Sequence, residues 1–567
     1  EEDYPIDAFK IASYNREELD VTDHPFTYFS GDVGTEDGLA PHFFIGRWSI
    51  RESSDIKKIQ RKTIQYTKMD YVSDNSYFER ALIVAGSYKT DAGNNEVYPF
   101  EWPVSPVWTS LWLQDRLTQF GYSKVDTALF YSGNRILTNP ILINSWENGV
   151  GIINYRGWGN VDGWAKPQFL YTDIPHLNVT YDLPVVFSFV CNTGDFGSNV
   201  VEPSFGEALL RAGTTGNPKG AVAMIGPSDL DTDTRFNNVM CGALWDGLLE
   251  GRTPELAQAL HAAKQAVAKE FSGITETGDG EAQDIPVFYH HVYGVLGDPS
   301  LPVWLSRPTD LSVLNDESES INGNLMLSDT FINIQVQDST GQPVQDVVGA
   351  LLYNGKLIAK GLSTIDGNLD IDFTETSDIT AGSEMELYLN KAQFFQKNIS
   401  VTLSEDNANI FEAHSYDYQM PESPKYYDVN TIEYDWIELN PTKGGIGENI
   451  YLTDDEIVAD VPIGFDFTYY GYTYSAVNIC SNGWVSFEES TIPYFWNFSI
   501  PFPMGPPAML AVFMDDLDDN GKEPFIDNND NHIYDSEDEF ITDCGTPENP
   551  SYPCHDYNQD GERKEGE

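Results

Sequence analysis

Two short apolar runs, residues 150–153 and 183–190, place the tightest limits on how this chain can fold. Each run is too short to cross a membrane, and each is followed at once by polar or glycine-rich sequence. Short runs that are apolar throughout are typical of strands buried on both faces, as in a parallel sheet covered by helices. We therefore expect two strands of one α/β sheet here.

The residues that follow these strands are candidates for chemistry, because functional groups of a doubly wound sheet gather beyond the carboxyl ends of its strands. Gly157, Trp158 and Gly159 follow the first run and predict a tight turn whose backbone amides can face a ligand. Cys191 follows the second run, where its thiol could act as a nucleophile. The alternative for Cys191 is a buried structural cysteine.

This pattern resembles the gingipain-type cysteine peptidases, which have a caspase-like fold. In that family one apolar strand ends in Gly-His-Gly, which carries the general-base histidine, and a neighbouring strand ends in the nucleophilic cysteine. The resemblance implies that Cys191 holds the nucleophile position and that Gly159 belongs to the oxyanion region. The supporting matches are Asp195 with Phe196, and residues 46–49, 164–167, 203–207 and 297–301.

One residue departs from the family pattern, because Trp158 stands where the family has its catalytic histidine. An indole cannot serve as a general base, and a positioned acid/base group contributes about 10²–10⁴ in rate. A free cysteine has a pKa of about 8.5, so only a few per cent is thiolate at neutral pH. His176, His290 and His291 are candidates for a substitute base, and each is alternatively a surface or structural histidine.

The composition excludes some partners. The chain has 89 acidic and 32 basic residues, a net charge of −57, whereas nucleic acids and anionic membranes select basic surfaces. This balance favours divalent cations and an extracellular setting, as a secreted or cell-surface protein. No apolar run approaches the roughly 18 residues of a membrane helix, so we expect no membrane span.

The pattern of apolar and polar residues changes along the chain and predicts several domains. Strands alternate with helices through residues 1–307, as expected for a caspase-like, doubly wound α/β sheet. Residues 308–404 alternate with period two and contain an Asn-Gly corner at 354–355, which predicts a β-sandwich resembling the immunoglobulin-like modules of gingipain-type proteins. Residues 405–426 are expected to be a linker, 427–514 a second β-sandwich, and 515–567 an acidic calcium-binding tail.

The tail repeats the spacing of calcium loops. Asp556, Asn558, Asp560 and Glu567 stand at positions one, three, five and twelve of an EF-hand-like loop, with Gly561 at its turn. Two earlier loops follow the spacing less completely, and the alternative is a solvated acidic coil. The expected Ca²⁺ ligands are Asp516, Asp518, Asn520, Asp527, Asn529, Asn531, Asp535, Asp538, Asp556, Asn558, Asp560, Glu562 and Glu567.

Five cysteines are too few for a disulfide scaffold in a chain of 567 residues. Cys544 and Cys554 are ten residues apart and either pair in an oxidising compartment or remain two free thiols. Cys241 and Cys480 lie in apolar segments, where we expect them to be core residues.

Three functions remain open. The first is a degenerate peptidase, a calcium-stabilised scaffold that binds a peptide or protein ligand. The second is an active cysteine endopeptidase that pairs Cys191 with a histidine from elsewhere and cleaves peptide or protein substrates. The third is a purely structural or adhesive surface protein with surface or self-assembly partners.

Overall fold

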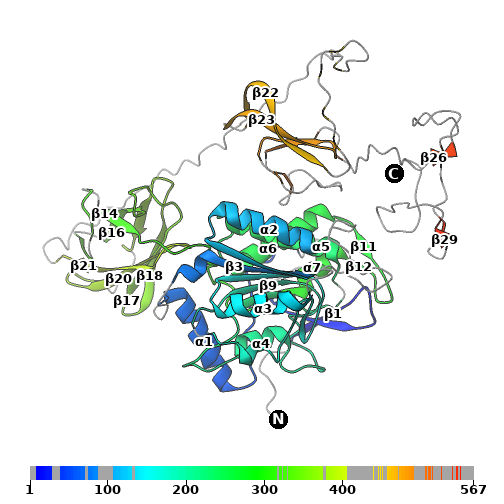
Figure 1. Cartoon of the computed structure of the whole chain (residues 1–567). Helices are drawn as coiled ribbons and strands as arrows, with labels where there is room; N and C mark the ends of the chain where they lie inside the picture. Colours follow the sequence, from blue (N-terminus) through cyan, green and yellow to red (C-terminus); the bar gives the residue numbers. More distant parts are fainter. Residues whose placement is uncertain are drawn as a thin grey trace. The chain divides into compact units, whose positions relative to one another are not determined.

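The computed structural model describes residues 8–28, 39–69, 75–86, 106–130 and 135–404, apart from 180, 231, 316–317, 322, 328–329 and 375–378. Beyond 404 it describes mainly 456–469 and 472–488, with short stretches between 439 and 550. The chain forms two compact units, Glu1–Tyr418 and Gln419–Glu567 (Figure 1).

The first unit is built on a six-stranded sheet in the order β13-β10-β9-β5-β3-β4. Five strands run parallel, and β13 pairs antiparallel with β10. The strands are β3 (Arg80–Gly86), β4 (Lys124–Phe130), β5 (Ile152–Arg156), β9 (Val185–Phe189), β10 (Ala223–Pro227) and β13 (Tyr293–Leu296).

Helices cover both faces of this sheet, as the sequence predicts for a doubly wound fold. In Figure 1, α2 (Pro106–Phe120), α5 (Thr234–Leu249) and α6 (Leu256–Glu270) lie on one face. On the other lie α1 (Ser53–Lys68), α3 (Arg135–Glu147) and α4 (Phe205–Arg211). The last helix, α7 (Ile285–Val292), leads into β13.

The two apolar runs form the expected neighbouring strands. Every residue of β5 and β9 is buried, and the parallel register places Arg156 opposite Phe189. Both strands therefore end at the same level, and the residues that follow them emerge at one edge of the sheet.

Smaller elements surround the sheet. The chain begins with a hairpin of β1 (Phe9–Ala12) and β2 (Leu19–Thr22), followed by η1 (His24–Thr27), and η3 (Asn75–Glu79) precedes β3. A small sheet of β6 (Gly159–Asn160), β7 (Gly163–Ala165) and β8 (Gln168–Leu170) follows β5 and leads to η4 (Ile174–His176). A short pair, β11 (Thr275–Glu276) and β12 (Gln283–Asp284), precedes α7.

Two further sheets follow, within residues 312–403. One contains β14 (Ser312–Asn315), β16 (Phe331–Gln337) and β19 (Asn368–Asp372). The other contains β15 (Asn324–Leu327), β21 (Lys397–Leu403), β20 (Glu384–Asn390), β17 (Val348–Tyr353) and β18 (Lys356–Leu362). Both sheets contribute to one core, with Ile334 from the first and Leu351 and Leu387 from the second. Assignment of this module to the immunoglobulin-like class stays a prediction.

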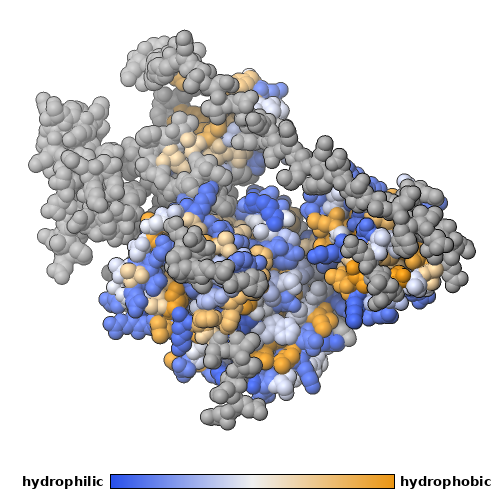
Figure 2. Space-filling model, turned by 180° about the vertical axis from the view of Figure 1, so that it is seen from behind, coloured by the Kyte–Doolittle hydropathy of each residue, from blue (hydrophilic) through white to orange (hydrophobic). Residues whose placement is uncertain are grey.

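The Asn-Gly corner lies where the sequence places it, because Asn354 and Gly355 turn the chain between β17 and β18 with φ values of 49° and 74°. The rear view in Figure 2 shows apolar residues on the surface of this module among hydrophilic ones. The edge strand β18 supplies two of the exposed apolar side chains, Leu357 and Leu362.

The second unit contains a four-stranded antiparallel sheet of β22 (Ile457–Tyr469), β23 (Tyr472–Cys480), β24 (Trp484–Ser486) and β25 (Met509–Ala511). Cys480 and Trp484 are buried in it, so Cys480 is a core residue as expected. Two-residue pairs follow at β26 (Phe525–Ile526) with β27 (Glu539–Phe540), and at β28 (Gly545–Thr546) with β29 (Asn549–Pro550). The second layer of the expected sandwich stays a prediction.

The helices of the described segments differ from membrane-spanning helices in length or in polarity. None of them is both long enough and apolar enough to span a membrane.

Candidate active site

The glycine turn and the cysteine segment meet at the carboxyl edge of the sheet. A Cβ atom added to Gly159 would lie 3.0 Å from Val190 Cγ1 and 3.2 Å from Thr193 Cγ2. These two residues flank the segment that carries Cys191, so the turn packs directly on that segment. The structure thus brings Gly159, Trp158 and Cys191 to one rim, as the sequence predicts.

A buried tyrosine fixes the backbone of the turn. The hydroxyl of Tyr155 donates to the carbonyl of Trp158 at 2.6 Å, while the carbonyl of Lys166 lies 3.0 Å from the same oxygen and the Lys166 N–H donates to it at 3.3 Å. Its ring stacks on Trp164 with centroids 4.5 Å apart. Burial raises the pKa of Tyr155, so the phenol stays protonated and remains a donor. Sequence analysis missed this role, because it depends on contacts across the small β6–β8 sheet.

The Trp158 side chain is presented to solvent rather than packed into the core. It is 49% exposed, and the Lys166 ammonium lies 5.0 Å from the ring centroid, within cation–π range. The position that carries a base in the resembled family therefore offers an aromatic face with a cation beside it.

The segment after Cys191 is held on the end of β10. Asn192 N donates to Asp229 O at 2.7 Å, and Gly194 N donates to Pro227 O at 2.8 Å. A Cβ at Gly194 would approach Gly226 O to 2.7 Å, so only glycine fits. The Cys191 side chain itself is half-buried. The backbone expected to carry a nucleophile is thus fixed in place.

Asp195, one of the residues that carry the family resemblance, lies in the same segment. Its carboxylate accepts a hydrogen bond from Gly197 N at 2.9 Å. Burial raises the pKa of Asp195 to about 6, because the charged form loses solvation. The neighbouring Phe196 ring lies beneath the Arg47 guanidinium, 4.4 Å from ring centroid to Cζ.

A buried arginine lies directly below the glycine turn. Arg156 Nη1 donates to Phe189 O at 2.6 Å, Nη2 donates to Thr234 O at 3.2 Å, and Asn238 Oδ1 accepts a further bond. Burial lowers the pKa of this guanidinium. The side chain joins the ends of β5 and β9 to the start of α5. Sequence analysis missed it, although a charge at the end of an apolar run was a visible signal.

The structure excludes one of the expected substitute bases, His176. The carbonyls of Pro175 and Leu177, on either side of it, accept hydrogen bonds from Lys219 Nζ at 2.8 and 2.6 Å. Lys219 precedes β10, so His176 lies at the amino ends of the strands, opposite the edge that carries Cys191. The structure therefore does not bring His176 to the Cys191 edge of the sheet.

His290 is engaged elsewhere. Its Nδ1 lies 2.7 Å from Pro286 O, and its Nε2 lies 3.2 Å from Gln265 Nε2. The carbonyl requires a proton on Nδ1, so Nε2 accepts from the amide and both nitrogens are used. Burial lowers the pKa of His290 to about 3. It is a neutral structural histidine rather than a base for Cys191.

His291 faces the amino-terminal segment. Its Nδ1 lies 3.3 Å from Thr22 Oγ1, and its ring packs edge-on against His24 with centroids 4.8 Å apart. Of the three expected substitutes, it is the one that the structure leaves as a candidate.

Three carboxylates that sequence analysis missed lie near the cysteine segment. Glu18, Asp20 and Asp229 each place an oxygen within 4.8 Å of the others. Burial, followed by repulsion from Asp229, raises the pKa of Asp20 to about 9. Asp20 therefore keeps its proton at neutral pH. No sequence spacing signals this cluster, because β2 and the end of β10 meet only in the fold.

The other site predictions fall into two groups. Cys241 is fully buried, and burial raises its pKa to about 12, as expected for a core cysteine. The thirteen predicted Ca²⁺ ligands and the Cys544–Cys554 pair lie outside the described residues and stay predictions.

Comparison with known proteins places the first half of the chain. The model of peptidase family C25 matches residues 5–304, and a model described as NIDO related matches residues 426–524. Gingipain R1 of Porphyromonas gingivalis is 24% identical over 336 residues, which cover 57% of this chain and 30% of the relative. Gingipain R2 of the same species is 25% identical over 345 residues, covering 58% and 42%. The chain thus spans less than half the length of these curated relatives.

Solved structures agree with this placement. The crystal structure of the Arg-specific cysteine proteinase gingipain R has a TM-score of 0.53 at 20% identity, covering 68% of this chain and 79% of that one. The complex of the RgpB pro- and mature domains gives 0.53 at 20% identity, covering 68% and 81%. These likenesses show a shared fold. Because the C25 match covers more than half of the chain, this protein belongs to peptidase family C25.

Proposed function

We propose that this protein is an extracellular, degenerate member of the family, which binds peptide segments at the rim formed by Trp158 and Cys191 without cleaving them efficiently. The main support for this proposal is the half-exposed indole of Trp158, which follows β5 where the family pattern predicts a base, next to the strand that leads to Cys191. Proteins of family C25 are peptidases, which supports a peptide or protein as the ligand.

The chemistry explains why cleavage is expected to fail. A cysteine peptidase must remove the thiol proton and later deliver a proton to the leaving amine. Trp158 offers only an indole N–H, which cannot accept the proton. His176 is at the wrong edge, and both nitrogens of His290 are occupied. Among these residues, the rim therefore retains a backbone scaffold but no group at Trp158, His176 or His290 that can take the thiol proton.

The same rim is suited to binding. The exposed face of Trp158 offers apolar contact area, and the Lys166 ammonium beside it can attract an acidic group of a peptide. Tyr155 holds the carbonyls of Trp158 and Lys166 in a fixed geometry, so little backbone order must be gained on binding.

Restoring the base tests the proposal. Hydrolysis of a fluorogenic peptide mixture is measured for the full chain, Trp158→His, Trp158→Phe and Cys191→Ala. We expect Trp158→His to gain a cleavage activity that disappears in the double variant Trp158→His/Cys191→Ala, while wild type and Trp158→Phe remain at background. Hydrolysis by wild type that Cys191→Ala abolishes would refute the proposal.

A second candidate function is an active endopeptidase, and one observation favours it. His291 is a buried imidazole on α7. The next residue, Val292, accepts a hydrogen bond from Ser228 N just after β10, and the segment that carries Cys191 is bonded to the same end of β10. This function predicts Cys191-dependent hydrolysis in wild type that is lost in His291→Phe but kept in His176→Phe. Equal activity of the two histidine variants would argue against it.

A further inference from the structure

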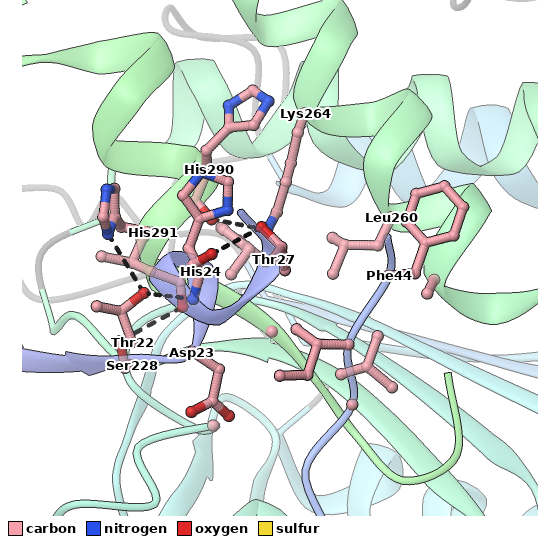
Figure 3. Close-up of a pocket in the computed structure, with 18 of the residues that line it drawn as sticks. Thr22, Asp23, His24, Thr27, Phe44, Ser228, Leu260, Lys264, His290 and His291 are labelled. Atoms are coloured by element: carbon pink, nitrogen blue, oxygen red, sulfur yellow. Dashed lines mark hydrogen bonds between the residues drawn. The ribbon is translucent and has the colours of Figure 1, made fainter. Parts of the chain in front are cut away.

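A pocket of about 70 Å³ opens between the amino-terminal segment and helices α6 and α7 (Figure 3). Gly194 and Phe196, from the segment after Cys191, contribute to its wall. A site of this volume holds several waters, since one water needs about 10–15 Å³ of such space. It therefore has room for a small organic group with a polar end.

Imidazoles gather around this pocket. Four of the nine histidines in the chain line it: His24 from η1, His261 from α6, and His290 and His291 from α7. The centroid of His24 lies 4.8 Å from that of His291 and 5.6 Å from that of His290, and His261 lies 6.2 Å from His290. Figure 3 shows His24 from η1, His290 and His291 from α7, and Lys264 from α6 around this pocket.

One amine points into this cluster. Lys264 Nζ donates to His290 O at 2.8 Å, and the side chain is buried. Asp23 is the one carboxylate among the described residues that line the pocket, and it accepts from Arg47 Nε at 2.7 Å. The amine is thus buried without a matched anion. The titratable and charged groups around it are Asp23, His24, Tyr28, Arg47, His261, His290, His291 and Tyr293.

Burial disfavours the charged form of these bases. It lowers the pKa of Lys264 to about 7, of His261 to about 4 and of His290 to about 3. In a chain of net charge −57, this pocket is a local exception: it is rich in basic nitrogen, and its one lining carboxylate is already paired. Among the described residues that line it, it holds no carboxylate free to pair with the amine.

We propose that this pocket binds a small carboxylate, whose oxygens pair with the Lys264 ammonium while its short apolar body lies against Phe44, Leu260 and Phe196. A carboxylate supplies the missing counter-charge, and a charge-assisted hydrogen bond is about twice as strong as a neutral one. The apolar walls and the small volume select a few-carbon acid rather than a phosphate ester.

Binding is then coupled to a proton. The bound carboxylate stabilises the charged amine and raises its proton affinity. Above pH 7 the free amine is mostly neutral, since burial lowers its pKa to about 7. The pocket therefore takes up close to one proton for each carboxylate bound near pH 8.5, and much less at pH 6, where the free amine is already charged.

Titration calorimetry of the full chain tests this with isobutyrate and its uncharged analogue isobutyramide. Runs at pH 8.5 in two buffers of different ionisation enthalpy measure the protons taken up. We expect isobutyrate to bind with close to one proton and isobutyramide to show no binding. Equal binding of the amide, or isobutyrate binding without proton uptake at pH 8.5, would overturn the proposal. Both results come from wild type and need no variant.

Variants locate the site. Lys264→Met is expected to weaken isobutyrate binding at least about tenfold, the loss of a charge-assisted hydrogen bond. Lys269→Met changes an exposed lysine of the same helix and is expected to bind as wild type does. Unchanged binding by Lys264→Met would contradict the assignment. A short peptide with a free carboxyl terminus, compared with its amidated form, shows whether the carboxylate can come from a peptide end or only from a free acid.

Discussion

At the scale of single residues, Trp158 and Asp20 show two ways in which a position can lose acid/base chemistry. At Trp158 the residue type has no base, and at Asp20 the surroundings keep the carboxyl group protonated. At Trp158, where the family pattern predicts a base, the chain presents a half-exposed indole beside Lys166. Asp20 keeps a carboxyl group and removes its charge, because burial and Asp229 raise its pKa to about 9.

Asp20 gives a prediction about pH. Its folded pKa of about 9 lies above the ordinary 3.8, so the folded state binds more protons across that interval. The contribution of Asp20 to stability is therefore complete below pH 3.8 and is lost as pH rises toward 9. Asp20→Asn cannot ionise, so the free energy of unfolding should fall less steeply between pH 5 and 9 than in wild type.

Urea unfolding of both proteins at pH 5, 7 and 9 measures this difference. Asp366→Asn, at an exposed turn, is the matched control and should follow wild type. Parallel slopes for Asp20→Asn and wild type would show that Asp20 is ionised in the folded protein.

At the scale of elements, sequence reasoning found the strands and missed what joins them. Continuous apolar runs are enough to predict β5 and β9. A strand covered by helices on both faces is apolar along its whole length, and this pattern is visible in the local sequence alone. The parallel arrangement of these two strands was also predicted, and it brings the residues that follow them, Gly159 and Cys191, to one edge of the sheet. The contacts of Arg156, the Asp20 cluster and the Lys264 pocket depend on residues far apart in the chain, which no local pattern brings together.

Arg156 carries the element-scale prediction. Arg156→Met removes the donor to Phe189 O, and a buried acceptor left unpaired costs about 1–3 kcal/mol. We expect a fall in the free energy of unfolding of that order, measured by urea denaturation.

Arg252→Met is the control, since Arg252 is an exposed residue just beyond α5 that pairs with Asp246. Exposed ion pairs contribute at most about 1 kcal/mol, so this variant should change little. Equal stability of the two variants would mean that Arg156 does not hold the ends of β5 and β9 together.

At the scale of the whole molecule, the chain joins a C25 domain to β-rich modules and an acidic tail. We propose that the tail binds Ca²⁺, as its three loops of oxygen ligands predict. Calcium binding is measured by thermal unfolding of the full chain after chelation with EDTA, and again after Ca²⁺ or Mg²⁺ is added back in excess. Removal of Ca²⁺ should lower a transition temperature, and Ca²⁺ should restore it better than Mg²⁺. A melt unchanged by chelation would remove the calcium assignment.

The proposed loss of peptidase activity depends most on Trp158, whose indole stands where a cysteine peptidase would need an imidazole to activate Cys191. Labelling of Cys191 by a peptidyl electrophile at neutral pH, followed by mass spectrometry of the full chain, tests it most directly. We predict slow labelling in wild type and labelling at least about tenfold faster in Trp158→His, since a positioned base is worth about 10²–10⁴ in rate. Fast labelling of wild type that Trp158→His does not increase would contradict the account.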